Sequence, residues 1–214
     1  MSLHNQDEVT NTLTLLHKAG FRSAIVAGGA VRDAYFGIKP RDIDIYVWHP
    51  DFSLRNERTE TLTELSLSKI LQLDFSKDTI TDVSTDSYYG EEIVEIFDVV
   101  KNGILYQIIS VERRPKDFVD MYFDIGLCKA TYDGERVNYF PEFLADASNK
   151  HLTVVSDQLD QQQFDYTMNV HMPKMQQKFP TYKVQIAPWN KTFAEAAKEP
   201  AAPIVAEWPR KSIC

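Results

Sequence analysis

The sequence predicts an α/β (α+β) fold, and three observations lead to this fold class. Helical and strand patterns alternate over residues 9–48, two later segments have the composition of β-hairpins, and apolar residues after position 156 recur at helical spacing. The chain has 214 residues, of which 43% are hydrophobic, and this is enough for a substantial core.

The chain opens with a helix and a strand. Val9, Leu13 and Leu16 recur at helical spacing, and Gly20 is placed to end that helix. Residues 23–27 are a short apolar run rich in branched side chains, which is typical of a strand.

A second helix and strand follow directly. Residues 30–36 have room for two helical turns before Gly37. Pro40 keeps the next residues extended, so that residues 42–48 are predicted to form a strand. Residues 53–73 alternate leucines with charges and fit one amphipathic helix lying over the sheet.

The middle of the chain contains two predicted hairpins. The polar residues 74–90 support no prediction, but residues 92–111 are two β-rich runs joined by Asn102-Gly103, a strong hairpin turn signal. Asp133-Gly134 marks a second hairpin turn. Pro115 is placed to begin a short helix between the two hairpins.

The last part of the chain is mainly helical by pattern. Residues 141–146 fit a brief helix, and residues 151–155 fit a short edge strand. Ser156 is a residue typical of N-caps, and the apolar residues after it are spaced for one long helix that Pro173 should kink or split. His171 is expected on the surface of that helix.

Composition restricts the class of partner and the compartment. There are 23 Lys and Arg residues against 31 Asp and Glu residues, a net charge of −8, so no global field attracts a polyanion such as nucleic acid. Cys128 and Cys214 are the only cysteines, which excludes a disulfide framework and suits a reducing compartment. With no signal-like start and no long apolar run, the sequence predicts a soluble, cytoplasmic protein without a membrane partner.

Two aspartates interrupt the apolar strand predicted at residues 42–48. Because side chains alternate along a strand, Asp42 and Asp44 should share one face while Ile43 and Ile45 lie on the other. Two adjacent carboxylates repel each other unless a cation lies between them, and hard oxygen ligands suit Mg²⁺ or Mn²⁺. Taken alone, this alternation also fits a half-exposed strand with a polar outer face.

A pair of glycines precedes the two aspartates in the sequence. Gly28 and Gly29 lie at the preceding strand-to-helix turn, and Gly29 is 13 positions before Asp42. Glycine lets backbone amides approach a phosphate, and the start of the following helix offers free N–H groups and a favourable dipole. The turn is therefore suited to a triphosphate, and the neighbouring strand to the metal ions that bridge it.

Together these residues resemble a known family. The pattern "GGAVRD…GIKPRDIDIYV" is similar to the head domain of the DNA polymerase β nucleotidyltransferase superfamily, most closely to class II CCA-adding enzymes and bacterial poly(A) polymerases. The resemblance implies the nucleotidyltransferase fold, a small mixed sheet with helices on one side, in a compact stand-alone member of the phage type. Residues 1–140 would form this domain, residues 141–187 a C-terminal helical extension packed on it, and residues 188–214 a loosely ordered tail.

The resemblance also implies the site residues. Asp42 and Asp44 would be the catalytic metal ligands for Mg²⁺ or Mn²⁺, and an NTP would be the substrate. Its phosphates would be bound by four residues, namely Gly28, Gly29, Arg32 and Arg41. The resemblance also implies that Arg32 and Asp33 brace the turn, and the alternative interpretation is an ion pair between them that caps the first helical turn.

One expected carboxylate is missing. The family has a third acid on the strand that leaves the hairpin, and Gln107 stands at that position. Because Gln brings no negative charge, the metal position that activates the nucleophile would be weaker. Glu95 or Asp98 on the partner strand would offset the loss if either faced the site, whereas outward polar residues of an alternating strand are the ordinary interpretation.

Two functions are compatible with this sequence. The first is an Mg²⁺-dependent nucleotidyltransferase that transfers a nucleoside monophosphate to a hydroxyl of RNA, protein or a small molecule. The second is a catalytically degenerate protein that binds a nucleotide or a partner. CCA addition is not expected, because the sequence shows no counterpart of the helical neck with which CCA-adding enzymes select CTP or ATP. Five basic residues either flank the cleft, where they would hold phosphates or an acidic acceptor, or belong to a solvated turn, namely Lys39, Arg41, Arg113, Arg114 and Lys116.

Overall fold

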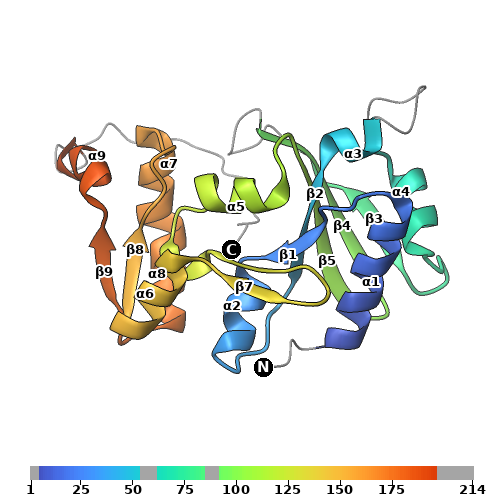
Figure 1. Cartoon of the computed structure of the whole chain (residues 1–214), viewed down its shortest axis with the longest axis horizontal. Coiled ribbons are helices and arrows are strands. Elements are labelled where there is room, and N and C mark those ends of the chain that lie inside the picture. Colours follow the sequence, from blue (N-terminus) through green and yellow to red (C-terminus); the bar gives the residue numbers. More distant parts are fainter. Residues whose placement is uncertain (1–4, 54–61, 85–91, 197–214) are drawn as a thin grey trace. The chain divides into compact units, whose positions relative to one another are not determined.

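The computed structural model describes residues 5–53, 62–84 and 92–196, which include two compact units (Figure 1). The first unit comprises Met1–Val119 with Ala130–Asn138, and the second comprises Asp120–Lys129 with the chain from Tyr139 onward.

A mixed sheet of seven strands forms the centre of the first unit, in the order β3-β4-β5-β2-β1-β6-β7. β2 and β5 run parallel, whereas the pairs β1–β2, β1–β6, β3–β4 and β4–β5 are antiparallel. The predicted mixed sheet is thereby confirmed. The strands are β1 (Ile25–Ala27), β2 (Ile43–Trp48), β3 (Thr79–Asp82), β4 (Ile93–Lys101), β5 (Ile104–Val111), β6 (Ala130–Tyr132) and β7 (Val137–Tyr139).

Helices α1 (Gln6–Ala19), α2 (Gly29–Tyr35) and α5 (Pro115–Tyr122) lie where the sequence predicts them. Gly20 ends α1 in the left-handed region with φ of 106°, a conformation that glycine adopts without strain. Both hairpins are confirmed. Asn102 and Gly103 have φ of 51° and 76°, as a two-residue turn with matching twist requires.

The single helix predicted at residues 53–73 is wrong. β2 runs directly into α3 (His49–Ser53), and α4 begins only at Glu64 and ends at Leu71. Thr63 has an extended backbone and caps α4 through a reciprocal pair of hydrogen bonds with Ser66, which fixes the start of the helix. Residues 54–61 of the predicted helix lie outside the described part of the chain.

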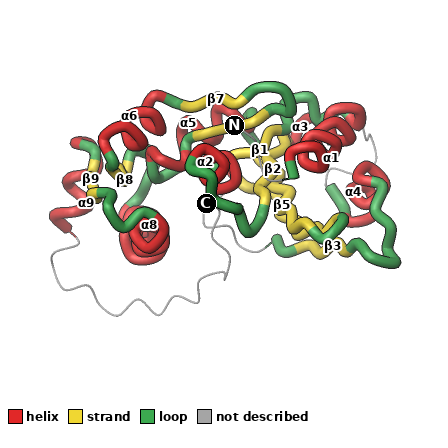
Figure 2. Tube along the Cα trace, turned by 90° about the horizontal axis from the view of Figure 1, so that it is seen from below, coloured by secondary structure: helices red, strands yellow, loops and turns green. Residues whose placement is uncertain are grey.

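The two faces of the sheet are distinguished by alternation along β5. Tyr106 lies opposite Ile43 and near Thr12 of α1, so α1 covers the face that carries Tyr106 (Figure 2). Burial on this face raises the pKa of the Tyr106 hydroxyl to about 12. Gln107, the next residue, therefore points to the opposite face.

The second unit combines helices with a two-stranded parallel sheet. β8 (His151–Val154) pairs with β9 (Lys183–Ile186). The helical elements are α6 (Pro141–Asn149), α7 (Gln161–Tyr166), α8 (Met172–Lys178), α9 (Lys191–Ala196) and the short 3-10 turns Gly126–Cys128 and Pro188–Asn190.

The long helix predicted from Ser156 begins later than expected. Asp160 is the N-cap, and its side chain accepts a hydrogen bond from the Gln163 N–H. Ser156 instead donates its hydroxyl to the carbonyl of Met121, 2.6 Å away. Between α7 and α8 the chain makes a π-helical turn, Thr167–His171, shortly before Pro173. Proline provides no N–H for the helix, and the wider turn accommodates this interruption.

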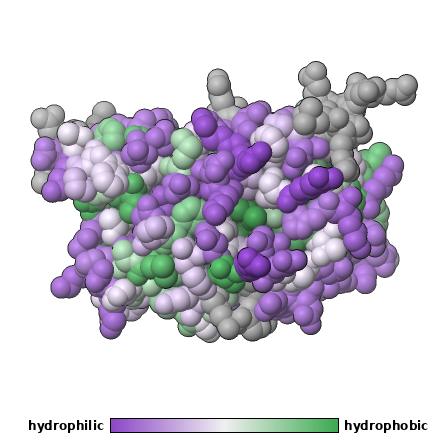
Figure 3. Space-filling view, in the orientation of Figure 1, coloured by the Kyte–Doolittle hydropathy of each residue, from purple (hydrophilic) through white to green (hydrophobic). Residues whose placement is uncertain are grey.

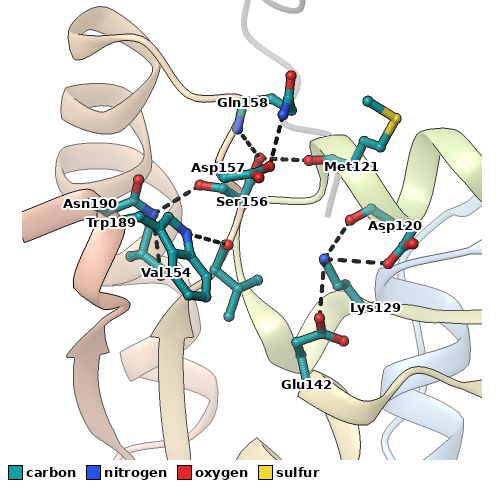
Figure 4. Close-up of polar contacts among 11 residues, drawn as sticks. Asp120, Met121, Lys129, Glu142, Val154, Ser156, Asp157, Gln158, Trp189 and Asn190 are labelled. Atoms are coloured by element: carbon teal, nitrogen blue, oxygen red, sulfur yellow. Dashed lines mark hydrogen bonds and ion pairs between the residues drawn. The ribbon is translucent and has the colours of Figure 1, made fainter.

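Order extends further than predicted into the C-terminal tail. Residues 188–190 form a 3-10 turn, and the Trp189 indole N–H donates to the carbonyl of Val155 at 2.9 Å (Figure 4). The Asn190 side chain is 1% exposed and donates to the Ser156 carbonyl at 2.9 Å. These bonds attach the turn to the end of β8, so the predicted loose tail is wrong for residues 188–196. The rest of it lies outside the described residues.

Gly126 occupies a position with no room for a side chain. A Cβ at this residue would lie 2.8 Å from Oδ2 of Asp146, a buried carboxylate that accepts hydrogen bonds from the Thr153 N–H and hydroxyl. We expect Gly126→Ala to lower the free energy of unfolding by about 1–3 kcal/mol, measured by urea denaturation. In an Asp146→Ala background the same substitution should cost much less. An equal cost in both backgrounds would contradict the clash.

Polar side chains cover most of the face drawn in Figure 3, and apolar ones are scattered among them. Within the described ranges, every helix is too short or too polar to cross a bilayer.

Candidate active site

The backbone conformation of the glycine turn explains why its first residue, Gly28, is a glycine. Gly28 has φ of 70° and ψ of −128°, a region that side chains disfavour. Its N–H donates to the carbonyl of Ala130 at 3.0 Å, so this amide belongs to the sheet. Gly29 is half-buried and begins α2. Backbone contact with a phosphate would therefore fall to Gly29 and the residues after it.

Strand register brings this turn to the aspartates. β1 and β2 are antiparallel, with Val26 opposite Ile45. Continued by one residue, the register places Ala27 beside Asp44, and the glycine turn follows immediately. The turn and the acidic end of β2 therefore meet at the same end of the sheet.

Asp44 belongs to a polar row that crosses three strands, with Gln107 of β5 in the middle. In β2 it is only 4% exposed, and it lies opposite Gln107 of β5, which in turn lies opposite Asp98 of β4. Paired residues in a sheet share a face, so all three side chains point away from the α1 face. Asp42, half-buried, lies one residue before β2 and two before Asp44, which places it on the same face by alternation.

The two acids of β4 lie on opposite faces. Gln107 donates its Nε2–H to Oδ1 of Asp98 at 2.8 Å. Glu95 is three residues away from Asp98 and pairs with Ser110, on the Tyr106 face. Of the two candidates for offsetting the missing carboxylate, the structure therefore brings Asp98 to Gln107 and turns Glu95 away.

Glu95 is not the outward polar residue that alternation predicted. It is 7% exposed, accepts a hydrogen bond from the Leu62 N–H at 3.1 Å, and has His49 Nδ1 3.8 Å from its Oε2. Burial raises the pKa of this carboxyl, and the nearby His49 offsets part of that effect.

The predicted phosphate-binding arginines differ in their surroundings. Arg32 is 2% exposed, and its Nε and Nη2 lie 2.9 and 2.8 Å from Oδ1 of Asp33. The structure thus contains the ion pair considered as the alternative for these two residues. Arg41 is exposed, immediately before Asp42. The other basic residues include Arg113, paired with Glu92 at 3.0 Å, and Arg114, stacked over the Trp48 ring.

The donor set suits a hard divalent cation held partly by substrate. Among the described residues, no three side chains of the types His, Cys, Asp and Glu are grouped so as to hold a metal ion. Mg²⁺ is commonly bound in proteins by one or two carboxylates, with water and substrate phosphates completing the shell. Asp42 and Asp44 therefore fit the ion that accompanies a nucleotide.

A buried polar cluster in the second unit was missed by the sequence analysis. His171, predicted to be on the surface, is 2% exposed, and its Nδ1 lies 2.6 Å from Oδ2 of Asp124. The Thr167 hydroxyl donates to the same oxygen at 2.8 Å. Thr167 and His171 are four residues apart in a helix, and this spacing gave the only signal of a shared face. Their partner is 47 residues from His171 in sequence, and nothing local indicates it.

Comparisons with known proteins identify the fold. Neither a family model nor a curated protein matches this sequence. Among solved structures, a tRNA-processing enzyme aligns with a TM-score of 0.57 at 15% identity, covering 91% of this chain and 47% of its own. The CCA-adding enzyme of Thermotoga maritima, complexed with tRNA, aligns with a TM-score of 0.56 at 20% identity, covering 88% of this chain and 42% of its own.

A third similar structure, a CCA-adding enzyme with CTP, has a TM-score of 0.56 at 16% identity and covers 93% of this chain and 47% of its own. The chain spans less than half the length of each of these three proteins. At these identities the likeness establishes the nucleotidyltransferase fold that the sequence motif predicted.

Proposed function

We propose that this chain is a nucleotidyltransferase that uses Mg²⁺ or Mn²⁺ and transfers a nucleoside monophosphate from an NTP to a hydroxyl group. The acceptor hydroxyl would belong to an RNA, a protein or a small molecule. Use of an NTP is consistent with a cytoplasmic location.

The meeting of the glycine turn with Asp42 and Asp44 at one end of the sheet is the observation that carries this proposal. Backbone amides from Gly29 onward would contact the phosphates, and exposed Arg41 would add a positive charge beside them. The two carboxylates would hold a divalent ion, which lowers the proton affinity of the attacking hydroxyl and neutralises charge on the phosphates.

The transfer is a substitution at the α-phosphorus. The acceptor oxygen forms a bond to that atom and releases its proton to water, while the bond to the β-phosphate oxygen breaks and pyrophosphate leaves with the electron pair. The chain supplies position and charge, and no covalent intermediate with the protein is needed.

Gln107 favours a second candidate, a protein that binds NTP and metal without turnover. It lies beside Asp44, where the family resemblance expects a carboxylate. Loss of that charge weakens deprotonation of the acceptor more than it weakens nucleotide binding, because two carboxylates and the phosphates suffice to hold one ion.

One experiment separates the two candidates. The protein is incubated with each of the four α-³²P-labelled NTPs, Mg²⁺ or Mn²⁺ and a cell extract, and label is scored in RNA, protein and small molecules. We expect label in one acceptor class for the wild type and none for Asp44→Asn. Metal-dependent NTP binding without transfer would support the binding protein. Absence of both binding and transfer would refute the proposal.

A further inference from the structure

The hydrogen bond between Gln107 and Asp98 assigns the two ends of the Gln107 carboxamide. A carboxylate has only acceptors, so the atom that Gln107 presents to Asp98 Oδ1 at 2.8 Å must be the Nε2 donor. Gln107 is 3% exposed, and this bond restricts rotation of its amide group. The carbonyl oxygen Oε1 is consequently turned away from Asp98.

Asp98 and Asp44 flank Gln107 on either side, one on β4 and the other on β2. Neighbouring strands are about 4.8 Å apart, so an oxygen at the end of the Gln107 side chain is within reach of an ion bound by Asp44. An amide oxygen is a normal ligand of hard divalent cations. Without Asp98, the amide could reverse and direct its NH₂ group, which repels a cation, toward the same place.

We infer that Asp98 is a positioning residue, which holds Gln107 so that its Oε1 serves as a neutral third oxygen ligand beside Asp42 and Asp44. This inference rests on the proposed function. In this arrangement the third carboxylate is not simply lost. Asp98 keeps the negative charge one strand further from Asp44, and that charge acts on the metal through the Gln107 amide. Outer-shell groups of this kind typically change metal affinity by about 10–100-fold.

Mn²⁺ binding to the full chain without nucleotide, measured by electron paramagnetic resonance, tests this inference. Asp98→Asn keeps the shape of the side chain but can either accept from Gln107 or donate to it, so the Gln107 amide is no longer restricted to one orientation. We expect its Mn²⁺ affinity to fall by about 10-fold. Gln107→Leu should lose a similar factor, and the double variant should lose no more than either single one.

Two further variants provide the controls. Glu95→Gln removes an acid from the opposite face of the same strand, and we expect Mn²⁺ affinity to change less than about twofold. The second is a double variant, Asp98→Asn with Gln107→Glu, in which the carboxylate and the amide change places. The total charge and a hydrogen bond between β4 and β5 are retained, but the carboxylate now lies on β5. This double variant should bind Mn²⁺ at least as tightly as the wild type.

The Gln107 side-chain amide gives a readout that needs no metal. In metal-free wild type, its NH₂ protons should appear in ¹⁵N-correlated NMR spectra as two separated signals that exchange slowly with water, and Asp98→Asn should bring them together or speed their exchange. If Asp98→Asn leaves both this signal and Mn²⁺ affinity unchanged, the inference is overturned. If the wild type binds neither Mn²⁺ nor NTP, the proposed function fails and the metal role fails with it. If the wild type binds Mn²⁺ and Asp98→Asn binds it equally tightly, whatever its amide signals, the positioning role is refuted and the proposed function stands.

Discussion

Replacing Asp44 by Asn is expected to reduce nucleotidyl transfer by about 100-fold or more, since loss of an outer-shell group alone costs about 10–100-fold in metal affinity or activity. Asp44 is nearly buried at the end of β2 beside the glycine turn. Its carboxylate brings the charge that an amide lacks, and the substitution preserves its shape. Asp42→Asn should have a similar effect. Transfer and metal-dependent NTP binding are both measured on the purified variants.

Stability distinguishes a metal ligand from a structural acid. If the carboxylates of Asp42 and Asp44 repel each other in the absence of metal, either Asn variant should unfold in urea at the same concentration as the wild type or at a higher one. Asp7→Asn in the first turn of α1 is a matched change of charge, and we expect normal transfer from it. Unfolded Asp44→Asn protein, or full activity in it, would contradict the assignment.

The second large effect is expected in the buried cluster of the second unit. Removing one member of a buried ion pair typically costs about 3–5 kcal/mol, because the other charge is left uncompensated. His171→Leu should therefore lower the free energy of unfolding by about this amount, while Thr167→Val, which removes one hydrogen bond to Asp124, should cost about 1–3 kcal/mol. Urea denaturation of the full chain measures both.

A double variant tests whether the pairing itself matters. Asp124→Leu with His171→Leu replaces both polar partners by apolar groups and should be more stable than His171→Leu alone. If the double variant loses as much stability as Asp124→Leu and His171→Leu lose in sum, or if His171→Leu loses less than about 1 kcal/mol, the two side chains are not energetically coupled.

The same cluster predicts how stability changes in acid. Burial by itself raises the pKa of Asp124, but the facing His171 and the hydrogen bonds to Asp124 bring that pKa below its usual range. A group with a lowered folded-state pKa contributes stability above its unfolded pKa, about 4, and this contribution is lost as the pH falls through the folded value. Melting temperatures measured from pH 5 to 2 should therefore fall less steeply for Asp124→Asn than for the wild type.

The pKa values of two other buried acids are shifted in the opposite direction. Burial raises the pKa values of Glu95 and Asp146, so their charged forms disfavour folding and their protonation on acidification favours it. Glu95→Gln should remove that part of the pH dependence between pH 7 and about 4. An unchanged profile would indicate that Glu95 has an ordinary pKa in the folded protein.

The elements that the sequence predicted correctly are those encoded within a few residues. Asn102-Gly103 specifies a tight turn because both residues accept a positive φ, and Gly20 ends α1 for the same reason. Alternation within β2 likewise separates Asp44 from Ile43 and Ile45 without any knowledge of the rest of the chain.

The remaining features depend on which segments meet, and only the tertiary structure decided them. Alternation along β4 places Glu95 and Asp98 on opposite faces, but only the β4–β5 register shows that Asp98 is the one beside Gln107. His171 has an Asp partner 47 residues away, and a helical pattern cannot report such a distance. The burial of a side chain and its polar partner depend on neighbours from distant parts of the chain. Turns and alternation, in contrast, follow from the backbone conformations that single residues can adopt.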